Sequence, residues 1–238
     1  MLSDGTVRSA SEISELTGIP QGARSGKVTA HLAYMQVMGL LEEDKATLTQ
    51  LGQCIKSEDP ACSELLTQWL LHANLTSVRG ADMWHYVYRE LLPSNGGNVS
   101  IPYYKQSVAD HYGIRKEHAV VRTCYTNGMA EINYLKEEND GLSVCRQKIQ
   151  REYTYLYAYD ILREWEALYG DVREITAEQF ESMQCAACFG LNATDWFTVL
   201  ETLCTKGLFQ LNRQLTPYTV IRNTDATSII DKLYSLLI

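Results

Sequence analysis

Eight side chains have the types and spacing to bind the phosphate groups of a nucleic acid. Six are permanently cationic and two are histidines, and several lie three or four residues apart, which makes them neighbours on a helix surface. Clustered cations of this kind position a protein on a phosphate backbone without reading the base sequence. A short basic run is also typical of a solvated helix face, so a structural alternative stays open. The candidate DNA-binding residues are Arg24, Lys27, His31, Lys105, Arg115, Lys116, His118 and Arg122.

The charge distribution is compatible with such a local contact. The 238 residues carry 21 lysines and arginines against 29 aspartates and glutamates, a formal net charge of −8. This balance argues against nonspecific coating of DNA by bulk charge. Residues 99–150, however, carry 7 basic and 6 acidic side chains and a net charge of +1, whereas residues 1–98 stand at −4 and residues 151–238 at −5. The middle segment alone is not acidic.

No arrangement of residues identifies a catalytic site. The single CxxC pair, Cys185 and Cys188, lacks the second close pair that a zinc site would need, so two core cysteines are expected. The sequence has no HExxH pair and no GxxxxGK[ST], GxGxxG or GxSxG motif. A metal-dependent nuclease needs clustered carboxylates. The acidic runs at residues 42–44 and 137–140 lie where hairpin turns are expected, which favours solvated charges and leaves any catalytic residue unknown.

Cysteine usage and hydropathy indicate the cellular context. The 7 cysteines are odd in number and scattered, which is typical of reduced thiols in a cytoplasmic protein rather than of a secreted disulfide framework. No run approaches the roughly 18 apolar residues that span a bilayer, and the amino terminus lacks a signal-peptide pattern. We therefore expect a cytoplasmic protein with no membrane partner.

The amino-terminal segment contains the clearest supersecondary pattern. A capping box at residues 9–12 begins a first helix, and residues 18–20 end it. A second helix is expected from about Arg24, followed by two short strands at residues 40–43 and 47–51. This order predicts a winged helix-turn-helix whose second helix contacts DNA near its start. The alternative is a winged helix used for protein contacts or dimerisation.

Two weaker copies of the pattern follow. In the first, residues 103–111 and 115–125 are expected to form two helices around Gly113, with Ala119, Val120 and Cys124 facing inward. In the second, a helix over residues 193–205 precedes a hairpin over residues 208–222. The second copy has few cations, so packing is the more natural role for it than DNA binding.

These patterns predict a mainly α protein of tandem winged-helix or helix-turn-helix-like modules with short β-hairpins. Apolar helical stretches between the modules are expected to form the core. The expected domains are a winged helix-turn-helix (residues 1–52), a helical linker or core (53–98), a basic helix-turn-helix-like module (99–150) and a helical, winged-helix-like module (151–238).

One series of motifs carries a family resemblance. Residues 48–92 contain LTQLG, then EDP, then TQWLLH and MWHY. This series resembles a bacterial family found in phage-defence islands associated with DNA phosphorothioation, and it is similar to the B component of the Ssp-type system. The basic segment at residues 115–125 and the segment YAYDILREW at residues 157–165 also fit the family, so the resemblance covers most of residues 9–168.

The resemblance implies a DNA-binding component of a phosphorothioation or phage-defence system, together with a nicking activity that would need Mg²⁺ or Mn²⁺. The expected partners are double-stranded DNA and other subunits of the system, with a homodimer as a further expected state. Family members usually begin with an additional aromatic- and His-containing stretch ahead of the first helix-turn-helix. If that stretch carries the chemistry, the resemblance implies a protein that binds DNA without cutting it. The alternative function is that of a protein-interaction subunit: a non-enzymatic scaffold that uses its winged helices to assemble a defence complex.

Overall fold

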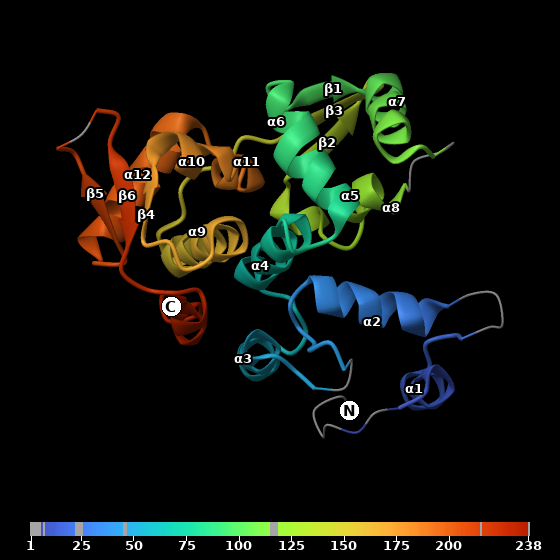
Figure 1. Ribbon diagram of the computed structural model, residues 1–238. Coiled ribbons are helices and arrows are strands. Elements are labelled where there is room, and N and C mark those ends of the chain that lie inside the picture. Colours follow the sequence, from blue (N-terminus) through green and yellow to red (C-terminus); the bar gives the residue numbers. More distant parts are fainter. Residues whose placement is uncertain are drawn as a thin grey trace. The chain divides into compact units, whose positions relative to one another are not determined.

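The computed structural model describes Thr6 and residues 8–21, 26–44, 47–114, 119–214 and 216–237. Its contacts divide the chain into two compact units, Met1–Ser63 (unit 1) and Glu64–Ile238 (unit 2) (Figure 1). Each unit buries its own apolar side chains. The finer division into four modules stays a prediction.

The first helix of unit 1 forms where its local signals place it. Helix α1 (Ala10–Thr17) begins at Ser9, whose hydroxyl accepts a hydrogen bond from the N–H of Glu12 while the Glu12 carboxylate accepts one from the N–H of Ser9. These bonds satisfy two N–H groups that a helix start leaves open. Gly18 ends the helix in a left-handed conformation with a φ of 72°, which glycine adopts without steric cost.

The rest of unit 1 departs from the expected hairpin. Helix α2 (Lys27–Val37) is followed by a single antiparallel bridge between Leu41 and Leu48. The prediction of a strand over residues 47–51 is wrong, because Thr49 caps helix α3 (Gln50–Glu58) by accepting a hydrogen bond from the N–H of Gly52 at 2.9 Å. A threonine hydroxyl at this position favours a helix start over continued strand pairing. The winged-helix assignment stays a prediction.

Two long helices form the centre of unit 2. Helix α4 (Leu65–Thr76) is buried along almost its whole length and contacts α9 (Thr154–Tyr169). The chain between them first forms α5 (Asp82–His85), a π-helical segment (Tyr86–Leu91) and α6 (Leu92–Ser94). A π-helical segment is rare and is often found at functional positions. This one carries Arg89, whose side chain is buried.

A three-stranded antiparallel sheet follows, in the order β1-β3-β2. Its strands are β1 (Asn98–Ser100), β2 (Leu135–Glu138) and β3 (Gly141–Val144). Helix α7 (Ile101–Tyr112) starts directly after β1 and ends at Gly113, as expected. The acidic run at residues 137–140 does lie at a hairpin turn, where Asn139 and Asp140 adopt positive φ values of 48° and 60°.

The basic segment after α7 folds differently from the prediction. Residues 115–118 lie outside the described residues, and α8 (Val120–Thr123) passes at once into a 3₁₀ turn (Cys124–Thr126). The expected inward positions of Ala119 and Val120 are wrong, whereas Cys124 is half-buried. Val121 and Tyr125, four residues apart, are buried instead, while Val120 is 43% exposed. The apolar face is therefore shifted by one residue.

The carboxyl-terminal part of unit 2 matches its predicted helix and hairpin. Strands β4 (Glu174–Thr176), β6 (Thr219–Arg222) and β5 (Phe209–Asn212) form a second antiparallel sheet in this order. Helices α10 (Ala177–Ser182), α11 (Cys185–Cys188) and α12 (Ala193–Thr205) lie between β4 and β5 in the sequence, and a 3₁₀ segment (Thr227–Lys232) follows β6. The predicted stripe of α12 is buried at Trp196, Val199, Leu200 and Leu203.

The mainly α class with short hairpins is thus confirmed. Over the parts of the chain that the structure describes, no helix is both long and apolar enough to cross a membrane.

Candidate nucleic-acid interface

The first group of predicted DNA contacts lies on the first turns of α2. Lys27 and His31 are both exposed, and Nδ1 of His31 lies 2.6 Å from the carbonyl oxygen of Lys27. Because a carbonyl oxygen only accepts, Nδ1 donates this bond, which holds the ring along the helix. Arg24 lies outside the described residues.

Beside this helix start, unit 1 has an apolar groove of about 380 Å³. Side chains from α1, α2, α3 and the adjoining turns form its walls, and the lining also includes His31, Arg8 and Lys56. The apolar lining residues include Ile13, Val28, Leu32, Met35, Leu48 and Ile55. The helix that presents Lys27 and His31 to solvent therefore also borders an apolar surface.

The second group is only partly described. Lys105 is exposed on α7, whereas Arg122 on α8 forms an ion pair with Glu137 of β2 and its side chain is only 12% exposed. Arg115, Lys116 and His118 lie outside the described residues. The structure thus brings Arg122 to a carboxylate that sequence reasoning had assigned to a solvated turn.

The tyrosines around this group divide into two classes. Tyr103 is 50% exposed on α7, in reach of a ligand at the surface. Tyr104 and Tyr125 are fully or almost fully buried and belong to the core. The phenol of Tyr125 lies 2.6 Å from Nδ1 of His72, so stacking on a nucleic acid by these two rings is excluded.

Sequence reasoning missed a buried ionic cluster at the centre of unit 2. Arg89 is completely enclosed, and its Nη2 lies 2.6 Å from Oδ1 of Asp160 and 4.0 Å from Oε1 of Glu164. Its Nε donates to the carbonyl oxygen of Thr76 at 3.2 Å, and Nη1 donates to that of Met183 at 3.2 Å. The cluster therefore joins α4, the π-helical segment, α9 and the turn before α11. A signal existed: two carboxylates four residues apart interrupt the otherwise apolar face of α9.

Burial shifts the pKa values of several groups in and beside this cluster. Burial raises the pKa of the Asp160 carboxyl, and the charge of Arg89 opposes that shift. Burial likewise raises the pKa of the Cys188 thiol to about 12, and it raises the pKa of Cys185 well above the usual range. Both cysteines are buried free thiols, as expected for a CxxC pair in a core.

The described residues do not form a metal centre. Within the described ranges, no group of three or more His, Cys, Asp or Glu side chains could hold an ion. A buried, enclosed cluster also offers no access to a substrate. We therefore assign the Arg89 cluster a structural role, and the surface cations remain the candidates for binding.

No family model and no curated protein sequence matches the chain. Two solved structures do match it in fold. One is described as a magnesium ion-bound SspB crystal structure, with a TM-score of 0.65, 15% sequence identity and coverage of 89% of this chain and 76% of SspB. The other, an SspB crystal structure, has a TM-score of 0.68 and 14% identity over 94% of this chain and 79% of SspB. The fold of SspB thus extends over most of this chain, in agreement with the motif resemblance at residues 48–92.

Proposed function

We propose that this chain is a DNA-binding component of a bacterial DNA phosphorothioation or related phage-defence system. The observation that carries the proposal is the SspB-like fold over 89–94% of the chain, together with the motif series that resembles the same family. The motif series and the fold similarity point to the same family, and the fold similarity holds at only 14–15% sequence identity.

The DNA contact is proposed at the exposed cations of the two predicted helix-turn-helix patterns. Lys27 supports it best, because it is exposed on the first turn of α2 and forms no ion pair with any residue that the structure describes. Lys105 adds an exposed cation on α7. Arg122 can contact a phosphate only if its ion pair with Glu137 opens, so we expect it to contribute less to DNA affinity than Lys27 does. Arg24, Arg115, Lys116, His31 and His118 complete the proposed set.

A salt titration of duplex binding tests this proposal. A labelled DNA duplex is titrated with the full chain at several salt concentrations, and fluorescence anisotropy gives the association constant. The logarithm of this constant should fall with the logarithm of salt concentration by about 0.9 for each phosphate neutralised. Lys27→Ala and the double variant Arg115→Ala/Lys116→Ala should each weaken binding and flatten the slope. Arg173→Ala, an exposed cation outside the proposed set, is the matched control.

Nicking is a separate part of the proposal. The described residues offer no ready-made set of metal ligands, so we derive no catalytic step for Mg²⁺ or Mn²⁺. Supercoiled plasmid incubated with the protein and either ion should yield open-circular DNA if the chain nicks. The absence of that product from clean, duplex-binding protein removes nicking and leaves DNA binding intact.

The apolar groove of unit 1 favours a second candidate, a scaffold subunit that binds other proteins of the system. Apolar surface bordered by charged side chains is typical of protein–protein contacts. A folded protein that binds no duplex even at low salt would favour this candidate. Sedimentation velocity would show in the same preparation whether the chain forms the expected homodimer.

A further inference from the structure

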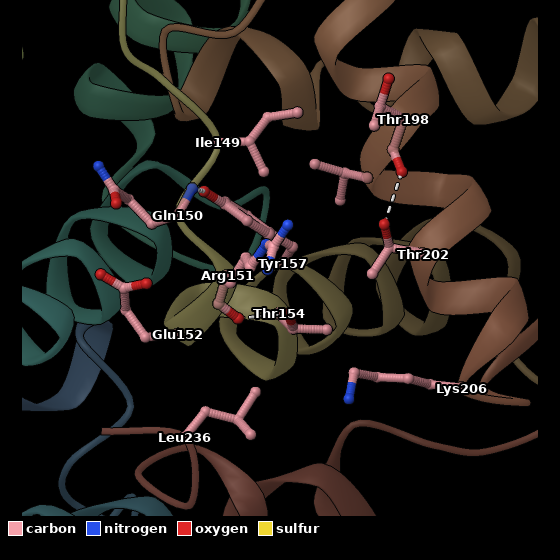
Figure 2. A pocket seen from close by; sticks show the side chains of 11 residues that line it. Ile149, Gln150, Arg151, Glu152, Thr154, Tyr157, Thr198, Thr202, Lys206 and Leu236 are labelled. Atoms are coloured by element: carbon pink, nitrogen blue, oxygen red, sulfur yellow. Dashed lines mark hydrogen bonds between the residues drawn. The ribbon is translucent and has the colours of Figure 1, made fainter. Parts of the chain in front are cut away.

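A groove of about 620 Å³ lies in unit 2 between the start of α9, the exposed side of α12 and the carboxyl-terminal segment (Figure 2). Ile149, Val199 and Leu236 form apolar parts of its wall. Tyr157 contributes to the wall as well, and its hydroxyl accepts a hydrogen bond from the N–H of Gln150 at 3.2 Å. That bond holds the chain entering α9 against the helix, so the groove has a defined shape.

Two cations from distant parts of the sequence line this groove. Arg151 precedes α9 and Lys206 follows α12, and both are exposed. In Figure 2 the Lys206 side chain extends into the space between Thr154 and Leu236. Glu152 supplies the acidic side chain of the lining, which leaves the lining with a net charge of +1. The groove is therefore cationic although residues 151–238 together are acidic.

A third cation lies close by. Nζ of Lys206 and Nζ of Lys232 lie 5.5 Å and 6.0 Å from the centre of the same ring, that of Tyr155. Attraction to a half-buried ring positions both ammonium groups while leaving their hydrogen-bond donors open. Lys206 thus shares the groove with Arg151 and the Tyr155 ring with Lys232, a set of positions that only the tertiary structure brings together.

Two other arginines of the same region have acidic partners. Arg213 pairs with Glu201 at 3.0 Å and Arg222 with Glu166 at 3.4 Å. Among the described residues, Arg151, Lys206 and Lys232 form no such ion pair. Their charge is consequently available to an anion from solution.

The volume of the groove indicates the size of ligand that it can hold. The volume falls within the roughly 300–1,000 Å³ typical of small-ligand sites, which suits one or two nucleotides but not a stiff duplex. Grooves that bind single strands combine cations for the backbone with apolar or aromatic surfaces for the bases. We propose that this groove binds single-stranded DNA, with a phosphate between Arg151 and Lys206 and a base against Ile149, Val199 and Leu236. This site goes beyond the proposed duplex contact and does not depend on it.

The test compares two DNA ligands on the full-length protein. Anisotropy titrations use a labelled 12-nucleotide single strand and, separately, a blunt duplex. Replacing both groove cations, Arg151→Ala/Lys206→Ala, should weaken single-strand binding about tenfold. It should reduce the salt slope by about 0.7, since the two cations share one phosphate and each single-strand phosphate contact contributes about 0.7. Duplex binding should change little. Lys206→Arg should keep single-strand affinity, and Arg173→Ala is the control for loss of an exposed cation.

Several results would overturn the proposal. Wild-type protein that does not bind the single strand at low salt, or a double variant with unchanged single-strand affinity, would each do so. Equal losses in the double variant and in Arg173→Ala would indicate a nonspecific charge effect and would also overturn it. A single-stranded RNA of the same length, bound more tightly than the DNA, would reassign the groove to RNA. Loss of duplex binding alone leaves the groove assignment standing and removes the proposed duplex contact instead.

Discussion

His72 should make unit 2 unstable in mild acid, because its environment accepts only the neutral ring. The ring is fully buried on α4, with Nε2 at 2.9 Å from the carbonyl oxygen of Cys188 and Nδ1 at 2.6 Å from the hydroxyl of Tyr125. The carbonyl can only accept, so Nε2 carries the proton and Nδ1 accepts from the phenol. A second proton on Nδ1 would force the Tyr125 hydroxyl to turn its own proton away and would place a positive charge inside the core.

The size of this loss of stability follows from the lowered pKa of His72. Burial is the main cause that lowers the pKa of His72 to about 3, and the charge of Arg89 adds to it, whereas the bond to Cys188 works in the opposite direction. An unfolded histidine titrates near 6.5, so below that pH the unfolded state binds a proton that the folded state refuses. Stability from this residue is therefore present at neutral pH and is lost as the pH falls. Between pH 7 and pH 5 the loss is about 2 kcal/mol, at about 1.36 kcal/mol for each pH unit.

Urea denaturation at pH 7, 6 and 5 measures this loss for wild-type protein and for His72→Gln, whose side chain does not titrate. Tryptophan fluorescence reports on unit 2 alone, since that unit contains all 4 tryptophans, Trp69, Trp84, Trp165 and Trp196. Other titrating groups contribute equally to the pH dependence of both proteins, so the difference between the two curves isolates His72. Asp160 is one such group, and its raised pKa changes stability with pH in the opposite direction. Parallel stability-versus-pH curves for the two proteins would refute the assignment of a buried neutral ring.

Three further predictions concern the same unit. Asp160→Asn should lower the free energy of unfolding by about 3–5 kcal/mol, because it leaves the Arg89 charge buried without its closest counter-ion; a loss no larger than that of an exposed substitution would contradict this in urea denaturation. Gly190→Ala should lower the free energy of unfolding by at least about 2 kcal/mol, because the residue has a φ of 60° and the added carbon would lie 2.6 Å from a backbone carbonyl oxygen. An unchanged thermal unfolding midpoint would contradict this, since it would mean that the backbone moves to relieve the clash. Cys185 and Cys188, both buried with raised pKa values, should stay unlabelled by a thiol reagent in the native protein and react in urea; rapid native labelling, located by mass spectrometry, would disprove their enclosure.

Local signals in the sequence were sufficient for several elements. The capping box at Ser9 predicts the start of α1, and the stripe of α12 predicts the face that packs inward. Such signals work because capping bonds and helical periodicity involve residues only three or four positions apart. Local signals gave the wrong element where two of them compete. At Thr49 the alternating pattern of apolar residues predicted a strand, but the threonine hydroxyl caps the start of helix α3 instead.

The sequence by itself determined the mainly α class, the absence of a catalytic motif and the family resemblance. The tertiary structure decided which charges are available for binding. Arg89 and Asp160, 71 residues apart, meet inside the core. Arg122 is paired with Glu137, whereas Arg151 and Lys206 line one groove and form no ion pair with any described residue. The physical reason is that the environment of a charge depends on neighbours distant in the chain, which net charge and spacing along the sequence do not reveal.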